Sequence, residues 1–200
     1  NAPLILAFPH VGTDLADVAA QFRSPWLARR DADWWVDRLY AFAADRGATL
    51  IRTTISRSVI DLNRDPSGAS LYPGQATTAL CPTTTFDGDP LYAAAPPDEA
   101  EIARRRDRWF TPYHDALEAE IARLRALHPH IVLYDAHSIR SHVPRLFDDE
   151  LPQFNIGTDG GVFRSQPTVD NGRFQPAHGG MAAIQLNYVA QHPTVPAFLL

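Results

Sequence analysis

Three apolar stretches along the chain predict buried strands of one sheet. The first covers residues 4–8 and ends at Pro9, which cannot donate a backbone hydrogen bond to a neighbouring strand. The second covers residues 48–54, and the third, at 130–134, is a continuous apolar run of the kind found in fully buried strands. Two weaker apolar segments follow at residues 179–186 and 195–200.

Two segments between these strands have helical spacing. Residues 31–46 repeat apolar side chains near the helical period, with acidic residues at the start and Gly47 at the end. Residues 97–127 carry the clearest apolar stripe, with an interruption at Thr111-Pro112. Residues 61–97 have no period and predict a long irregular excursion, which in compact domains is usually functional. The aromatic cluster expected in the core is Trp26, Trp34 and Trp35.

The alternation of strands and helices predicts an α/β fold. We expect a mainly parallel central sheet with helices on both faces. The chain has 200 residues, 45% of them hydrophobic, which is enough for a single domain spanning residues 1–200.

Composition and charge exclude several classes of protein. The formal net charge of −5 disfavours a nucleic-acid-binding surface, and the absence of a long apolar run predicts no membrane-spanning helix. All 18 basic residues are arginine, so neither a Schiff-base lysine nor a phosphate-binding P-loop lysine is available. The N-terminus has no pattern of a signal peptide, and Cys81 is the single cysteine, so we expect a cytoplasmic protein.

Two histidines lie where the predicted strands end. His10 follows the first strand and His137 follows the third, and sites in open α/β sheets form at that edge. Imidazole is the commonest metal ligand, and a carboxylate such as Asp135 can orient it. A third, acidic ligand is available in Asp33 or Asp37, four residues apart on one helical face. The alternative is that the histidines bond to backbone and that the acids complement the helix dipole.

A polar segment after the second strand holds two arginines and an asparagine. Arg57, Asn63 and Arg64 have the side chains needed to bind a carboxylate, so we expect a small acidic substrate. The alternative is a pair of local ion pairs with Asp61 and Asp65.

Short motifs in sequence order resemble those of one enzyme family. They are Pro9-His10-x-Gly12, Asp33-x-x-Val36-Asp37-Arg38-Leu39, Ser56-Arg57-x-x-Ile60-Asp61-x-Asn63-Arg64, Leu80-Cys81-Pro82-Thr83, Tyr134-Asp135-Ala136-His137-Ser138-Ile139 and Asn155-Ile156-Gly157-Thr158. Together they resemble the N-formylglutamate amidohydrolases, also called N-formylglutamate deformylases, from about Pro3 to Gly161 and again at Asn171-Gly172-Arg173-Phe174.

The resemblance implies a fold like that of zinc carboxypeptidases and phosphorylase/hydrolase-like proteins. It also implies a metal-dependent hydrolase, with zinc as the expected ion, that converts N-formyl-L-glutamate to formate and L-glutamate in histidine degradation. By position, the metal ligands would be His10, His137 and Asp33, with Asp37 as the alternative acid. Arg57, Asn63 and Arg64 would bind substrate, and Asp135 and Ser138 would support the metal ligands.

Two features depart from the family pattern. The stretches near 161–162 and within 174–188 are short, which indicates missing loop segments. A family glutamate suited to act as the general base is replaced in Gln185-Leu186-Asn187, so no base is identified in this chain. Two other functions therefore stay open: a peptidoglycan amidase or carboxypeptidase, and a non-catalytic metal-binding relative. The arginine segment and the absence of a signal-peptide pattern disfavour the amidase.

Overall fold

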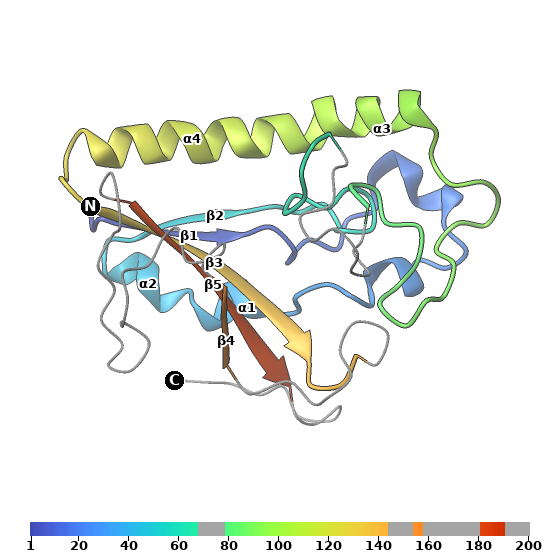
Figure 1. The fold of residues 1–200 in the computed structure, drawn as a ribbon, viewed down its shortest axis with the longest axis horizontal. Helices are drawn as coiled ribbons and strands as arrows, with labels where there is room; N and C mark the ends of the chain where they lie inside the picture. The colour runs from blue at the N-terminus through green and yellow to red at the C-terminus, as the bar shows by residue number, and fades with distance from the viewer. Residues whose placement is uncertain (68–78, 144–153, 158–180, 191–200) are drawn as a thin grey trace.

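The protein is described by a computed structural model that covers residues 1–67, 79–143, 154–157 and 181–190. A five-stranded sheet with strand order β2-β1-β3-β5-β4 forms its centre (Figure 1). The strands are β1 (Leu4–Phe8), β2 (Thr49–Arg52), β3 (Ile131–Arg140), β4 (Phe154–Gly157) and β5 (Met181–Ala190). All pairs are parallel except β4 with β5, so the predicted mainly parallel α/β fold is confirmed.

Helices cover both faces of the sheet. The long rod of α3 (Glu99–Arg105), a π-helical turn η3 (Arg106–Phe110) and α4 (Thr111–Arg125) lies on one face, and the short helices α1 (Val36–Leu39) and α2 (Phe42–Asp45) lie on the other (Figure 1). Two 3-10 turns, η1 (Ala16–Gln21) and η2 (Leu27–Arg29), precede α1. No helix among the described residues has the length and apolarity needed to cross a membrane.

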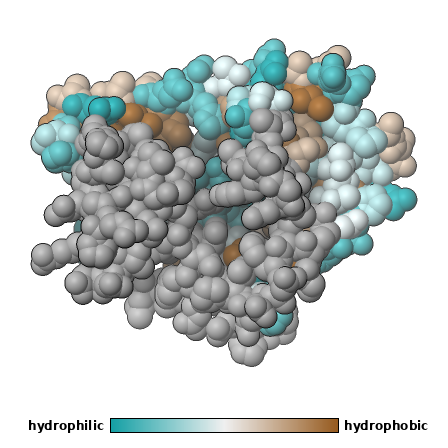
Figure 2. Space-filling model, in the orientation of Figure 1, coloured by the Kyte–Doolittle hydropathy of each residue, from teal (hydrophilic) through white to brown (hydrophobic). Residues whose placement is uncertain are grey.

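Strand β1 divides the core into two layers because its side chains alternate. Ile5 packs with Leu124 and Ile131 beneath α4, whereas Leu6 and Phe8 pack with residues of α1 and α2 on the opposite face. A third cluster joins the irregular segments around Val59, Leu80 and Leu91 to the π-helical turn. Figure 2 shows mostly hydrophilic residues, with small apolar patches, along the edge formed by α3 and α4.

The α3–η3–α4 rod forms where the apolar stripe predicted a helix. The side chain of Asp98 accepts a hydrogen bond from the Glu101 backbone N–H at 2.9 Å and caps α3. Pro112 lies in the first turn of α4 and lacks an N–H, so the α-helical ladder is interrupted there. The chain passes this point through the π-helical turn, so the helix continues past the predicted interruption.

The predicted helix over residues 31–46 is only partly confirmed, because two short helices replace one continuous helix. The structure has only α1 and α2 in this segment, and Asp33 precedes both. The Asp33 N–H donates to the carbonyl oxygen of His10 at 2.9 Å instead of joining a helical ladder. Trp35 then adopts a left-handed conformation with φ of 68°, and this starts α1 in a new direction.

The expectation of a tryptophan core is also wrong. Trp26, Trp34 and Trp35 contact one another at ring-centroid distances of 6.2 and 6.0 Å, but they are 38–63% exposed. In contrast, the strand predicted at 130–134 extends to Arg140, because β5 pairs with β3 along its whole length. The predicted excursion at 61–97 has neither helix nor strand in its described part, and the apolar tail at 195–200 lies outside the described residues.

Candidate metal centre

Three buried side chains meet where β1 ends. His10 follows β1, Asp33 lies in the loop before α1, and His137 lies within β3. The prediction that His137 follows its strand is wrong, because β3 continues to Arg140. However, β1 pairs with β3 only as far as Asp135, so His137 lies beyond the end of β1. One ligand atom from each of the three residues lies within 4.8 Å of the others.

The Nδ1 atoms of both histidines face the Asp33 carboxylate. His137 Nδ1 lies 3.0 Å and His10 Nδ1 lies 3.6 Å from Asp33 Oδ2, and the imidazole centroids are 4.6 Å apart. Ser138 Oγ donates to the other carboxylate oxygen at 3.2 Å and orients it. Three potential ligands therefore converge on one point, with Ser138 contacting Asp33.

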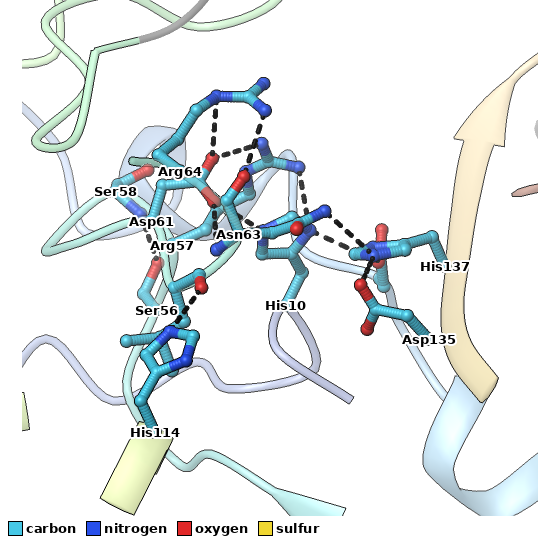
Figure 3. A network of polar contacts seen from close by, with 12 residues as sticks. His10, Ser56, Arg57, Ser58, Asp61, Asn63, Arg64, His114, Asp135 and His137 are labelled. Carbon is cyan, nitrogen blue, oxygen red and sulfur yellow. Dashed lines mark hydrogen bonds and ion pairs between the residues drawn. The ribbon is translucent and has the colours of Figure 1, made fainter. Parts of the chain in front are cut away.

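The second nitrogen of each imidazole contacts a carboxylate. His10 Nε2 lies 2.7 Å from Asp61 Oδ1, and His137 Nε2 lies 3.1 Å from Asp135 Oδ2 (Figure 3). With an ion bound, a carboxylate that accepts from Nε2–H would leave the Nδ1 lone pair to the metal. Without an ion, His137 Nδ1 donates to Asp33 and His10 Nδ1 lies 3.3 Å from Arg57 Nη1, so a metal would replace these contacts. Sequence reasoning identified Asp135 in this role but missed Asp61, which it considered only as a partner for arginine. The signal for Asp61 was its place after the second strand, close to the histidines at the same sheet edge.

Burial and charge together set the protonation of these groups. Burial disfavours the charged forms, but hydrogen bonds from His10 and His137 hold the pKa of Asp33 well below its usual range. Burial is likewise outweighed at His137, where Asp135 and Asp33 raise the pKa to about 10. The pKa of Asp61 is lowered by His10 and Arg57 despite its burial. The site therefore stabilises negative carboxylates that can face a cation.

The predicted substrate-binding residues surround this group. Arg57 Nη2 donates to Asp61 Oδ2 at 2.6 Å, Arg64 Nε lies 3.9 Å from the same oxygen, and the Asn63 amide nitrogen lies 3.2 Å from His137 Nε2 (Figure 3). The arginine–Asp61 pairing that the sequence left open is thus present. Asp65 accepts from the backbone N–H and the hydroxyl of Ser67.

The two candidate acidic ligands differ in position. Asp37 lies on α1 and accepts from Arg52 Nη1 at 2.7 Å in an exposed ion pair, whereas Asp33 lies between the two histidines. Helical spacing suggested a shared face for both acids, but Asp33 is not helical. The geometry therefore favours Asp33.

The His10–Asp33–His137 group fits a divalent cation. Two imidazole nitrogens and one carboxylate form a donor set that suits zinc and similar ions, and three protein ligands leave a position for water or substrate. The bonds to Asp61 and Asp135 fix the imidazole rings before any ion binds. The group can therefore bind a metal.

The departures from the family pattern concern mainly the C-terminal part. Position 187 pairs in register with His137, so the asparagine found in place of the family glutamate occupies the strand next to this group. The short stretch near 161–162, and residues 174–180 of the second stretch, lie outside the described residues.

Comparisons with known proteins agree with this architecture. The sequence model of the family described as N-formylglutamate amidohydrolase matches residues 2–190. The chain is 46% identical over 165 residues to the N-formylglutamate deformylase of Pseudomonas aeruginosa, covering 81% of this chain and 61% of that protein. It is 43% identical over 162 residues to the deformylase of Pseudomonas putida, covering 80% of this chain and 60% of that protein. The chain thus spans about three fifths of the length of these curated relatives.

Two solved structures have a similar fold. The crystal structure of the N-formylglutamate amidohydrolase from Ralstonia eutropha superimposes with a TM-score of 0.72 at 22% identity, covering 94% of this chain and 81% of that one. A gene product from Agrobacterium tumefaciens gives a TM-score of 0.67 at 14% identity with the same coverage. The family match over most of the chain, and the identity to two curated deformylases, show that this chain belongs to the N-formylglutamate amidohydrolase family.

Proposed function

We propose that the protein is a metal-dependent amidohydrolase that cleaves N-formyl-L-glutamate, or a similar N-acyl acidic amino acid, to formate and L-glutamate. The observation that supports this most strongly is the buried His10–Asp33–His137 group with Arg57 and Arg64 beside it. Metal ligands beside guanidinium groups suit a small substrate that carries an amide and carboxylates.

The residues of this chain have separate tasks in the proposed reaction. His10, His137 and Asp33 would hold the ion, with zinc as the expected metal. Such an ion would supply Lewis-acid chemistry, lowering the pKa of water and polarising a carbonyl oxygen. In the metal-bound protein, Asp61 and Asp135 would accept from Nε2–H and so keep the imidazole rings in the tautomer that presents Nδ1.

The arginine segment would position the substrate. Arg64 is about a quarter exposed at its side chain and faces Asp61 at the edge of the group, so it can reach a substrate carboxylate. Arg57 is buried and paired with Asp61, so it would lie beside the substrate amide and not at the carboxylate that Arg64 binds. In the overall reaction water adds to the formyl carbon, the C–N bond breaks, and the amine leaves with a proton. No described side chain is assigned as the base that transfers this proton.

The finer assignments rest on the family resemblance. We propose a single domain over residues 1–200, a fold related to the zinc carboxypeptidases, and a role in histidine degradation. Cys81 is a buried free thiol, which is consistent with a reducing compartment such as the cytoplasm.

Formate release tests the proposed function. The full-length protein is incubated with N-formyl-L-glutamate and with N-formyl-L-alanine, each with and without a metal chelator. We expect formate from the acidic substrate, less from the neutral one, and none after chelation unless zinc is restored. Release that a chelator does not affect would exclude the metal mechanism, and no release would favour a binding role.

Metal analysis of the same preparations tests the ligands. We expect a stoichiometric divalent ion in the wild-type protein and its loss in His10→Ala. Asp37→Ala should retain the ion, because Asp37 lies outside the group. Loss of metal from Asp37→Ala but not from Asp33→Ala would reverse the assignment of the acid.

A further inference from the structure

The segment that carries the arginines and Asn63 is held by the helical rod above it. Arg105 of α3 is fully buried, and its Nη1 donates to the carbonyl oxygen of Val59 at 3.0 Å. His114 of α4 lies with Nε2 2.9 Å from the carbonyl oxygen of Leu62 (Figure 3). A carbonyl can only accept, so His114 Nε2 carries the hydrogen and donates. The rod therefore holds both ends of the segment that leads to Asn63.

The π-helical turn makes this double attachment possible. An α-helix turns about 100° per residue, so residues nine positions apart, such as Arg105 and His114, face roughly opposite sides. The turn at Arg106–Phe110 takes up about one extra residue and reduces this offset to roughly 80–90°. Both side chains can then reach the same segment.

His114 is held firmly enough to act as a support. Its ring packs on Phe110 at a centroid distance of 4.1 Å, and Tyr113 contacts it edge-on at 5.3 Å. The Leu62 carbonyl belongs to the peptide that continues into Asn63, so its orientation fixes the direction from which Asn63 approaches His137. The Asn63 carbonyl in turn accepts from Arg64 Nη1 at 3.0 Å.

We propose that His114 is a positioning residue for substrate binding, acting through the Leu62 carbonyl on Asn63 and Arg64. This inference rests on the proposed function, because it assigns Asn63 and Arg64 to the substrate. The contacts of His114 are with Leu62, Phe110 and Tyr113 and not with His10, Asp33 or His137, so its effect appears in substrate affinity and not in metal content.

The test separates the ring from the hydrogen bond. His114→Phe keeps an aromatic ring against Phe110 but removes the donor, and His114 borders an open surface pocket of about 490 Å³. His114→Gln keeps an amide donor without the ring. His128→Phe is the matched control, because His128 Nε2 likewise contacts a backbone carbonyl, that of Asn1, at 3.1 Å in an exposed position.

We expect His114→Phe to raise KM for N-formyl-L-glutamate roughly 3- to 10-fold, the effect of one lost hydrogen bond, with a smaller change in kcat. His114→Gln should recover most of the affinity, and His128→Phe should match the wild-type enzyme. Calorimetric binding of L-glutamate to the same variants should weaken in parallel, and metal content should stay at the wild-type level.

Three outcomes overturn the inference. One is an unchanged KM in His114→Phe, and another is a glutamine variant no better than the phenylalanine variant. The third is a lower unfolding temperature with unchanged substrate affinity, which makes the bond a stabilising contact only. A wild-type protein that neither binds nor cleaves the substrate instead refutes the proposed function, on which this inference depends.

Discussion

Replacing Asp61 by asparagine tests how far the buried network depends on its negative charge. Asp61 is 0% exposed and accepts from His10 Nε2, from Arg57 Nη2 and from the Asn63 N–H. Asparagine keeps the shape and one acceptor oxygen, which can still serve His10 and Asn63. Its NH2 group, however, would face Arg57 Nη2, which lies 2.6 Å from Asp61 Oδ2. The substitution therefore leaves a buried guanidinium next to a donor.

The size of the effect follows from burial, not from distance. Removing one partner of a buried ion pair costs about 3–5 kcal/mol, because the remaining charge is left uncompensated. Asp37 offers a matched comparison, since its contact with Arg52 is nearly as short, 2.7 Å, but the Arg52 side chain is 63% exposed. Asp37→Asn should cost only about 0–1 kcal/mol. In a protein of this size the first value corresponds to a fall of roughly 6–20 °C in Tm.

Urea unfolding of metal-free Asp61→Asn, Asp37→Asn and wild-type protein measures both losses directly. We also expect about 10- to 100-fold weaker metal binding in Asp61→Asn, because the orientation of His10 loses its charged partner. If both variants lose the same stability, or if Asp61→Asn loses less than about 1 kcal/mol, burial does not control this pair and the reasoning is wrong. Unchanged metal affinity would remove Asp61 from its supporting role.

Three further predictions follow from other contacts. Gly12→Ala should lower Tm strongly, because the added Cβ would lie 2.3 Å from the backbone oxygen of Ile55; wild-type thermal stability in this variant would contradict the close packing. The hydrogen bond from Arg104 lowers the pKa of Glu101 to about 2 from an ordinary 4.5, so its contribution to stability is complete above pH 4.5 and is lost as the pH falls toward 2. The Tm difference between wild type and Glu101→Gln should therefore shrink over that interval, and a constant difference would refute this. Arg64→Ala should lower kcat/KM for N-formyl-L-glutamate, a loss of about 2–5 kcal/mol in transition-state binding free energy, and should affect N-formyl-L-alanine much less. Equal losses on both substrates would show that Arg64 has a structural role instead.

The sequence predicted the strands and the long helix because their apolar patterns are strong. Strands β1 and β2 and the α3–α4 rod lie where expected, and so does His10 after β1, whereas His137 lies within β3. His10 and Asp135 could be identified from sequence because each lies next to a strand that the apolar pattern predicts.

Other features depend on contacts between distant segments, which a local pattern does not contain. The helix expected over 31–46 is reduced to α1 and α2, and the Asp33 N–H bonds to the His10 carbonyl instead of joining a helix. The residues after Tyr134 are mostly polar, so the sequence pattern does not predict that β3 continues to Arg140. Pairing with β5 sets this extension. Asp61 acts on His10 from 51 positions away, so only the folded chain shows that they are partners.

Two of the candidate ligands, His10 and His137, lie within or just after different strands of the β1–β3 pair, and this affects how the protein folds. His10 follows β1 and His137 lies within β3, so the parallel pairing of these strands closes a very long loop, and Asp33 meets His137 from 104 positions away. Because closure entropy rises only with the logarithm of loop length, a chain can lengthen or shorten this crossover at small thermodynamic cost. Folding rate is more sensitive to such non-local contacts, so the site should assemble late. An ion added during refolding would then bind only molecules that have already joined the two strands, and the kinetics of its uptake would report the formation of the native topology.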